Sequence, residues 1–251
     1  MRRVLLALVA SALILSAASG ALVTSSATEN DLVTTVPSRQ IPKIPKSVYR
    51  IKTKDKVAFI TIDDGAYKPE NALAYVTANR LPITAFLSSW TIKDSKDYFN
   101  EFARWGSIQN HSATHASFGK KSTDLDHEIC YVQKRFGKKY DWYPWMLRPP
   151  YGAAQDSRAV RRMGEKCGIE QIVMWDASVG YGKISYANSK LRPGSIVLMH
   201  FSPKLKRDLK IAVKKIRDAG LTPANLADYL PRERIVPEML TVPVALRPPA
   251  R

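Results

Sequence analysis

The sequence predicts an α/β fold built on a parallel sheet that is either open or closed into a barrel. Hydrophobic residues make up 45% and charged residues 24% of the 251 residues, the proportions of a globular protein. Between Val48 and Leu230, short apolar segments alternate with amphipathic ones. Such alternation is typical of parallel strands joined by helices. The 12 glycines and 16 prolines follow no period, which excludes collagen-like and low-complexity chains.

Each expected element has its own residue pattern. Short apolar runs bounded by polar or turn residues predict strands at 57–62 (VAFITI), 83–88, 107–109, 169–175 and 195–200 (SIVLMH). Amphipathic spacing predicts helices at 69–79, 95–105, 125–136 and 205–219, with Gly220 as the C-cap of the last.

The first 21 residues have the pattern of a secretory signal peptide. Arg2 and Arg3 precede an apolar stretch that runs to Leu15, and the small residues 17–21 offer a cleavage site. An uncleaved N-terminal anchor is the alternative, because apolar character continues to Val23. We expect cleavage, and hence a protein without a stable membrane span that is secreted, either extracellular or associated with the cell wall. We also expect it to be a monomer.

Composition divides the rest of the chain into three parts. Residues 22–47 are rich in Ser, Thr and Pro and predict a flexible leader. Residues 48–230 carry the alternating pattern and predict a single domain. Residues 231–251 are rich in proline and predict a disordered tail.

The chain contains two cysteines, Cys130 and Cys167. In an oxidising compartment an even pair indicates a disulfide, with two unlinked buried thiols as the alternative. Neither cysteine has partners at zinc-finger spacing, so a structural zinc is not expected there.

The net charge of +17 suits a surface that meets polyanions. The predicted helix at 205–219 concentrates this charge around an apolar stripe, and a solvated outer helix is the simpler interpretation. The functional interpretation is contact with an anionic cell-wall polymer. Nucleic acid is not an expected partner for an exported chain.

Polar residues stand where the predicted strands end. Asp63 and Asp64 follow the first strand in TIDDG, His111 follows the third, and His200 closes the last. In a barrel such ends meet at one face, although an ordinary Asp-Gly turn would also explain the carboxylates. Two carboxylates aimed into one site require a cation or an arginine beside them.

Two further motifs could supply that cation. His111 and His115 are spaced by four, which places two imidazoles on one face of a helical turn and suits two corners of a metal site. Arg148 opens the stiff segment RPPYG and could hold a carboxylate ionised. A rigid surface turn is the alternative for this segment.

TIDDG, HSATH, RPPYG and VLMH together resemble the polysaccharide deacetylase family, the NodB homology domain, in order and spacing. The resemblance covers about residues 56–230 and implies a distorted (β/α) barrel with fewer than eight strands. It implies that Asp64, His111 and His115 bind a divalent metal, most often zinc. Asp63 would be the general base that activates water, and Arg148 would position it and stabilise its charge.

The resemblance assigns the remaining roles near the last strand. The backbone amide of Tyr151 would stabilise the oxyanion, His200 would protonate the leaving amine, and Leu198 would line the pocket for the acetyl methyl group. The family has a carboxylate that tunes this histidine. Ser178 occupies its place when the chain is aligned on the preceding tryptophan, and Asp176 lies close enough to be the other candidate.

The implied activity is metal-dependent removal of N-acetyl groups from a carbohydrate polymer with N-acetylglucosamine-type sugars, such as peptidoglycan or chitooligosaccharide. The basic charge favours a cell-wall substrate over neutral xylan or chitin. An O-acetyl esterase using the same site and a glycan-binding pseudoenzyme are the alternatives. The unusual residue at Ser178 favours the pseudoenzyme.

Overall fold

A computed structural model describes residues 47–232 of the chain. The predicted signal peptide, almost all of the predicted leader and most of the predicted tail lie outside the described residues. In the described part, no helix has both the length and the apolar character needed to cross a membrane.

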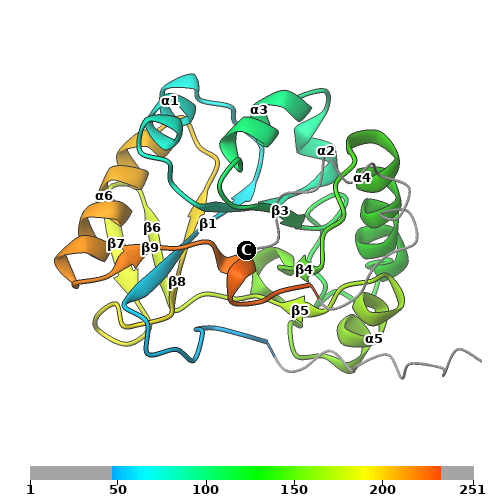
Figure 1. The fold of residues 1–251 in the computed structure, drawn as a ribbon. Helices are drawn as coiled ribbons and strands as arrows, with labels where there is room; N and C mark the ends of the chain where they lie inside the picture. The colour runs from blue at the N-terminus through cyan, green and yellow to red at the C-terminus, as the bar shows by residue number, and fades with distance from the viewer. Residues whose placement is uncertain (1–46, 233–251) are drawn as a thin grey trace, which may run out of the picture. The chain divides into compact units, whose positions relative to one another are not determined.

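The described residues form one nine-stranded sheet with helices around it (Figure 1). The strands are β1 (Val57–Asp64), β2 (Ile83–Leu87), β3 (Ser107–Asn110), β4 (Met146–Leu147), β5 (Gln171–Ile172), β6 (Ala177–Gly180), β7 (Lys183–Tyr186), β8 (Ser195–His200) and β9 (Thr222–Pro223). The main path runs β5-β4-β3-β2-β1-β8-β6-β7, and β9 pairs with β1. Every pair is parallel except the β6–β7 hairpin.

Helices connect most of the parallel strands. They are α1 (Glu70–Ala78), α2 (Ser89–Ile92), α3 (Lys96–Phe102), α4 (Val132–Tyr140), α5 (Arg158–Lys166) and α6 (Leu205–Asp218), with a π-helix η1 (Asp126–Tyr131) and 3-10 turns η2 (Pro150–Gly152) and η3 (Leu226–Asp228). Helices α1, α3 and α6 lie on one side of the sheet, and α4 and α5 lie near β4 and β5 (Figure 1).

The segment that precedes β1 pairs with residues at the ends of two strands that lie on opposite sides of β1 in the sheet. Val48 forms a parallel bridge with Val173, just after β5, and Arg50 forms an antiparallel bridge with Ser195 at the start of β8. A close backbone contact supports this arrangement, because a Cβ on Gly194 would lie 2.0 Å from the Ile51 carbonyl oxygen. The predicted α/β fold with a distorted barrel is confirmed. The expected strand number is wrong, because very short strands and the β6–β7 hairpin extend the sheet.

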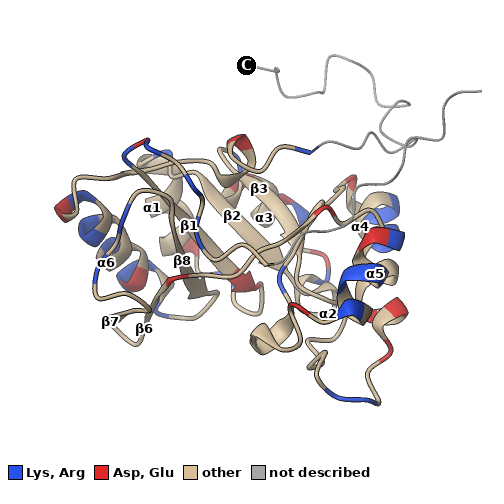
Figure 2. Ribbon diagram, turned by 90° about the horizontal axis from the view of Figure 1, so that it is seen from below, with Lys and Arg blue, Asp and Glu red and all other residues tan. Residues whose placement is uncertain are grey.

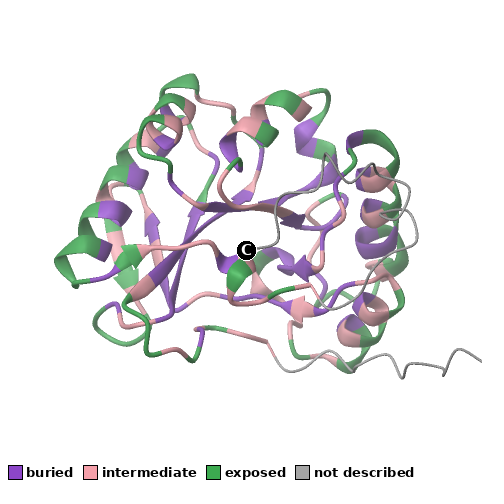
Figure 3. Ribbon diagram, in the orientation of Figure 1, coloured by how far each residue is buried: buried purple, intermediate pink, exposed green. Residues whose placement is uncertain are grey.

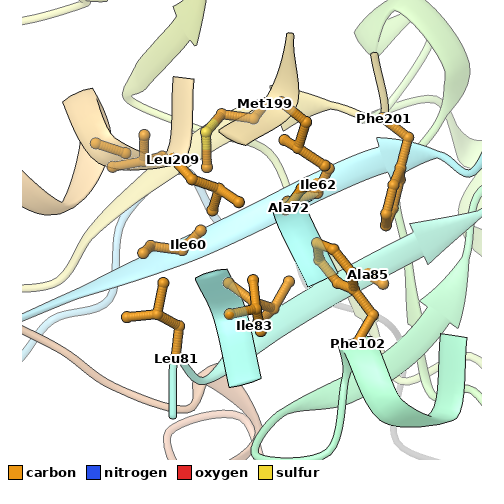
Figure 4. Close-up of a cluster of buried hydrophobic side chains, with 14 of the residues drawn as sticks. Ile60, Ile62, Ala72, Leu81, Ile83, Ala85, Phe102, Met199, Phe201 and Leu209 are labelled. Atoms are coloured by element: carbon orange, nitrogen blue, oxygen red, sulfur yellow. The ribbon is translucent and has the colours of Figure 1, made fainter. Parts of the chain in front are cut away.

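Strand β1 is buried on both faces, as parallel strands covered on both sides are. Ile60 and Ile62 pack with residues of α1, α3 and α6 in one core (Figure 4). Phe59 alternates to the opposite face and belongs to a second core with Phe86. Burial therefore concentrates on the strands, and exposed residues lie mainly on the helices and loops (Figure 3).

Several predicted elements have different bounds. The helix expected at 125–136 begins as the π-helix η1 and continues as α4. The strand expected at 169–175 is reduced to β5 because its neighbour β4 offers only two residues for pairing. Gly220 follows the C-cap Ala219 with φ 70°, a left-handed conformation that favours glycine.

Cys130 and Cys167 form a disulfide with a Cα–Cα distance of 5.0 Å, which confirms the expected pairing. The bond ties η1 to the residue that ends α5.

Candidate active site

The ends of β1 and β8 bring the predicted base and acid together. Strand β1 lies between β2 and β8, and Asp63 is in register with His200. Asp63 is 2% exposed, whereas His200 is exposed at the last position of its strand. Asp64 completes β1 with φ 81°, and its carbonyl accepts a hydrogen bond from the Ser88 amide at 3.0 Å.

Asp64, His111 and His115 converge on one point. Asp64 Oδ1 lies 3.3 Å from His111 Nε2 and 3.2 Å from His115 Nε2. One candidate ligand atom from each residue lies within 4.8 Å of the other two. Asp64 Oδ1 is buried and accepts no hydrogen bond, and a buried oxygen of this kind needs a partner. A divalent cation with oxygen and nitrogen ligands fits this donor set.

The two histidines lie on a loop, so the expected helical turn is wrong. Ser112 has φ 76° and His115 has φ 65°, both outside the helical region. Side chains take over the hydrogen bonds that a helix would have provided. Asn110 Oδ1 accepts from the Ser112 amide at 2.8 Å, and Ser112 Oγ accepts from the His115 amide at 2.9 Å. Strained backbone of this kind is typical of ligand-holding loops.

A backbone carbonyl orients the His111 ring. His111 Nδ1 lies 2.7 Å from the Arg148 carbonyl oxygen. Because a carbonyl only accepts, Nδ1 carries the proton and donates, so that in the neutral ring the Nε2 lone pair faces Asp64. This is the tautomer that a metal-binding histidine needs.

Glu128 is a site residue that sequence reasoning missed. It lies in η1 and is 4% exposed. Glu128 Oε1 accepts from the Thr114 hydroxyl at 2.6 Å, and Oε2 accepts from the Thr114 amide at 2.9 Å. Thr114 stands directly before His115, so this carboxylate fixes the loop that carries both histidines. A π-helix turn at a functional site is a recurring feature. The sequence pattern gave no signal, because a glutamate in an amphipathic helix resembles a surface charge.

Arg148 is fully buried and forms an ion pair with Asp63, with Nη1 2.7 Å from Oδ1. The same Nη1 donates to Thr61 Oγ1 at 2.9 Å. Nε and Nη2 donate to the carbonyl oxygens of Val173 and Met174, each at 3.0 Å. A buried guanidinium is stable only with such complete pairing. The network fixes one oxygen of Asp63, and the other lies 3.7 Å from His111 Nε2.

Burial and charge compete in the pKa values of these groups. Burial alone would raise the pKa of Asp64, but its close contacts with His111 and His115 outweigh this effect, so that the pKa lies well below its usual value. Burial lowers the pKa of His111, but the carboxylates of Asp63 and Asp64 reverse the effect and raise it. Burial lowers the pKa of Arg148 despite the opposing effect of Asp63. The two carboxylates therefore favour a positive charge at the position of the His111 ring.

Tyr151 lies next to the histidine loop. Its backbone has φ 59°, and the Gly152 amide donates to the Pro149 carbonyl at 3.0 Å across the turn. The residue is 73% exposed, and its ring meets that of His115 edge-on with centroids 4.7 Å apart. The stiff prolines of RPPYG thus present this residue at the cluster.

Asp176 contacts the start of β8, far along the strand from His200. Its carboxylate accepts from Ser195 Oγ and from the Ile196 amide, each at 2.9 Å. Ser178 is in register with Leu198, which is 5% exposed and shares a strand face with His200. Within residues 47–232, no ion pair involves His200. Asp176 is therefore a structural residue of the sheet.

Comparisons with known proteins agree with this arrangement. Residues 50–172 match the family model described as polysaccharide deacetylase. An uncharacterised protein of Streptomyces coelicolor, SCO4760, is 28% identical over 197 residues, which cover 75% of this chain and 78% of that protein. The peptidoglycan-N-acetylglucosamine deacetylase PgdA of Listeria monocytogenes is 27% identical over 186 residues. That match covers 68% of this chain but only 38% of PgdA.

A solved structure shows the same fold. It is BA3943 from Bacillus anthracis, a pseudoenzyme of carbohydrate esterase family 4, with a TM-score of 0.60 at 19% identity. The superposition covers 76% of this chain and 71% of BA3943.

Proposed function

Because the chain belongs to the polysaccharide deacetylase family through residues 50–172, we propose that it is a metal-dependent hydrolase that removes N-acetyl groups from a polysaccharide. The observation that carries the proposal is the buried Asp63–Arg148 pair beside the convergent Asp64, His111 and His115. The likeness to PgdA supports N-acetylglucosamine-type sugars, in peptidoglycan or a chitooligosaccharide, as the substrate.

Asp64, His111 and His115 would hold the metal, for which we propose Zn²⁺. Two imidazole nitrogens and one carboxylate oxygen are ligands that zinc takes in hydrolases, where an open position remains for water or substrate. When bound, the ion supplies Lewis acidity, which polarises the acetyl carbonyl and lowers the pKa of water.

Asp63 would accept the proton of the attacking water. Arg148 holds Oδ1 at 2.7 Å in a buried ion pair. Arg148 thus fixes Oδ1 and with it the orientation of the carboxylate, and Oδ2 remains to accept the proton. In the reaction the water oxygen bonds to the acetyl carbon, and its proton passes to Asp63.

His200 would complete the reaction as the general acid. The C–N bond breaks only if the amine nitrogen is protonated, and His200 lies beside Asp63 at the end of the neighbouring strand. The Tyr151 amide would donate to the developing oxyanion, and Leu198 would contact the acetyl methyl group. Acetate and a free amine are the products.

One observation favours a second candidate. No carboxylate within residues 47–232 forms an ion pair with His200, so none of these carboxylates holds its ring in place for proton donation. Two activities tolerate this better, namely cleavage of O-acetyl esters and glycan binding without catalysis.

Acetate release separates these functions. N-acetyl-chitooligosaccharides, purified peptidoglycan and an O-acetylated glycan are incubated with the wild type, Asp63→Asn and His200→Ala, with and without Zn²⁺. We expect zinc-dependent release from an N-acetylated substrate that is lost in both variants. Release from the O-acetylated glycan alone indicates an esterase. Binding without release from any substrate indicates the pseudoenzyme.

We further propose that the protein acts outside the cytoplasm, on the pattern of residues 1–21. Fractionation of cells that produce the full chain tests this. A shortened protein in the medium or wall fraction supports export, and an uncleaved cytoplasmic protein contradicts it.

A further inference from the structure

The first half of α6 carries cations around an open pocket. The pocket has a volume of about 480 Å³ and is lined by Asn71 of α1 and by the four cations Lys204, Lys206, Arg207 and Lys210. Figure 2 shows the basic residues gathered over α6.

Three of these four cations form no ion pair with an acidic group of the described residues. Among the ion pairs of residues 47–232, none involves Lys204, Lys206 or Lys210. Arg207 forms an ion pair with its neighbour Asp208, with Nε 3.1 Å from Oδ1. Farther along the helix, Lys214 pairs with Asp218 at 2.7 Å. Three cations without an ion pair, Lys204, Lys206 and Lys210, therefore lie together at the pocket.

The pocket lies near the proposed reacting groups in the fold. Lys204 follows His200 by a short turn, and α1 begins a few residues after Asp64. Strands β1 and β8 are direct neighbours, and α1 and α6 lie side by side (Figure 1). A glycan held at the strand ends can therefore extend toward the pocket.

We propose that this pocket binds an anionic group on the glycan chain whose acetyl group reacts, so that the substrate is an acidic polysaccharide. The inference rests on the proposed function. Lysine ammonium groups attract anionic oxygens as point charges, and carboxylates and phosphates share this chemistry. The net charge of +17 would further raise the local concentration of such a polymer.

Two charge-matched variants of the full chain test the pocket. One replaces Lys204, Lys206 and Lys210 with Gln. The control replaces Lys214, Lys215 and Arg217 with Gln, which removes the same charge from the other half of the same helix. Fluorescence anisotropy measures the affinity of each protein for labelled chitooligosaccharides that are neutral, carboxylated or phosphorylated.

We expect the wild type to prefer an anionic oligosaccharide over the neutral one. In the pocket variant, the ratio of the affinities for anionic and neutral oligosaccharide should fall about tenfold, which corresponds to about 1.4 kcal/mol. In the control variant this ratio should fall less than about twofold. The anionic probe that shows the larger loss identifies carboxylate or phosphate as the ligand. Equal losses in the two variants would mean that only net charge matters, and an unchanged preference in the pocket variant would also overturn the proposal.

The binding measurement is independent of hydrolysis. If acetate is never released but the preference depends on the pocket, the proposed deacetylase activity fails and the anion site stands. If acetate is released but neutral and anionic glycans bind alike, the deacetylase stands and the anion site fails. Circular dichroism melting of both variants verifies that they fold.

Discussion

Arg148 illustrates what one buried residue contributes to this site. All of its donor nitrogens reach protein oxygens, and the Asp63 carboxylate is one of the acceptors. The sequence showed an arginine beside two prolines, and only the resemblance to a family connected it to Asp63. Its complete burial depends on three separate segments of chain, and no local pattern encodes such packing.

Arg148→Lys tests this pairing. Lysine keeps the charge but cannot reproduce the planar set of donors, so we expect a loss of about 3 kcal/mol in the free energy of unfolding, measured in urea. Acetate release should fall because Asp63 loses its orientation. Arg104→Lys is the control, since Arg104 forms an exposed pair with Glu101 and should change stability by less than about 1 kcal/mol. Equal effects of the two variants would contradict the account.

The raised pKa of His111 predicts how protein stability and metal affinity change with pH. Without metal, the carboxylates raise its pKa above the usual 6.5, so the charged ring stabilises the fold below pH 6.5 and this contribution is lost as pH rises through the raised pKa. Metal requires the neutral ring, so metal affinity should increase over the same interval. Urea unfolding from acid to mildly alkaline pH, with EDTA or with Zn²⁺, should show curves that diverge as pH rises. Parallel curves would contradict this prediction.

Glu128→Gln tests whether the Glu128 carboxylate holds the loop that carries His111 and His115. Glutamine keeps the shape but loses the charge and one of the two acceptor oxygens that hold Thr114. We expect zinc affinity, measured by calorimetry, to fall about 10- to 100-fold. Glu101→Gln removes a partly exposed carboxylate and should leave the affinity unchanged. An unaffected Glu128 variant would show that the loop holds its shape alone.

Elements that depend on local periodicity were predictable, and those that depend on distant partners were not. Strands β1, β2 and β8 lie close to their predicted ranges because their apolar runs are continuous. Helix α5 was missed because only Val160 and Gly164 are buried in it, which leaves little apolar signal. The β6–β7 hairpin turns at Tyr181 and Gly182, both with positive φ, and is held by the Asp208 side chain, which accepts from the Gly182 amide at 3.1 Å.

The disulfide links the element that carries Glu128 to α5. Replacing Cys167 with Ser releases a loop of intermediate length, so we expect a loss of about 2–4 kcal/mol in unfolding free energy. Urea unfolding under oxidising conditions measures the loss. A reducing agent should shift the wild type to the same midpoint and leave the variant unchanged, and a wild type that does not respond would contradict the bond.

At the scale of the whole molecule, the sheet brings separate motifs to one edge. The sequence alone led to the right fold class and to the four motifs, because parallel strands end at a common edge. The convergence of Asp64, His111 and His115 within hydrogen-bonding range could not be read from spacing, since the loop that produces it has left-handed residues and side-chain hydrogen bonds. The position of Asp176 likewise could not be predicted from the sequence, because it depends on the register of β6 against β8.

The most direct test of the central claim counts bound zinc and released acetate in the same samples. The wild type and Asp63→Asn are stripped of metal, given Zn²⁺, desalted and incubated with N-acetyl-chitooligosaccharides and purified peptidoglycan. We predict equal zinc in both proteins and acetate release only from the wild type, because Asp64 and the histidines hold the metal while Asp63 accepts the proton. A wild type that binds no zinc, or an Asp63→Asn variant that releases acetate at the wild-type rate, would contradict the account.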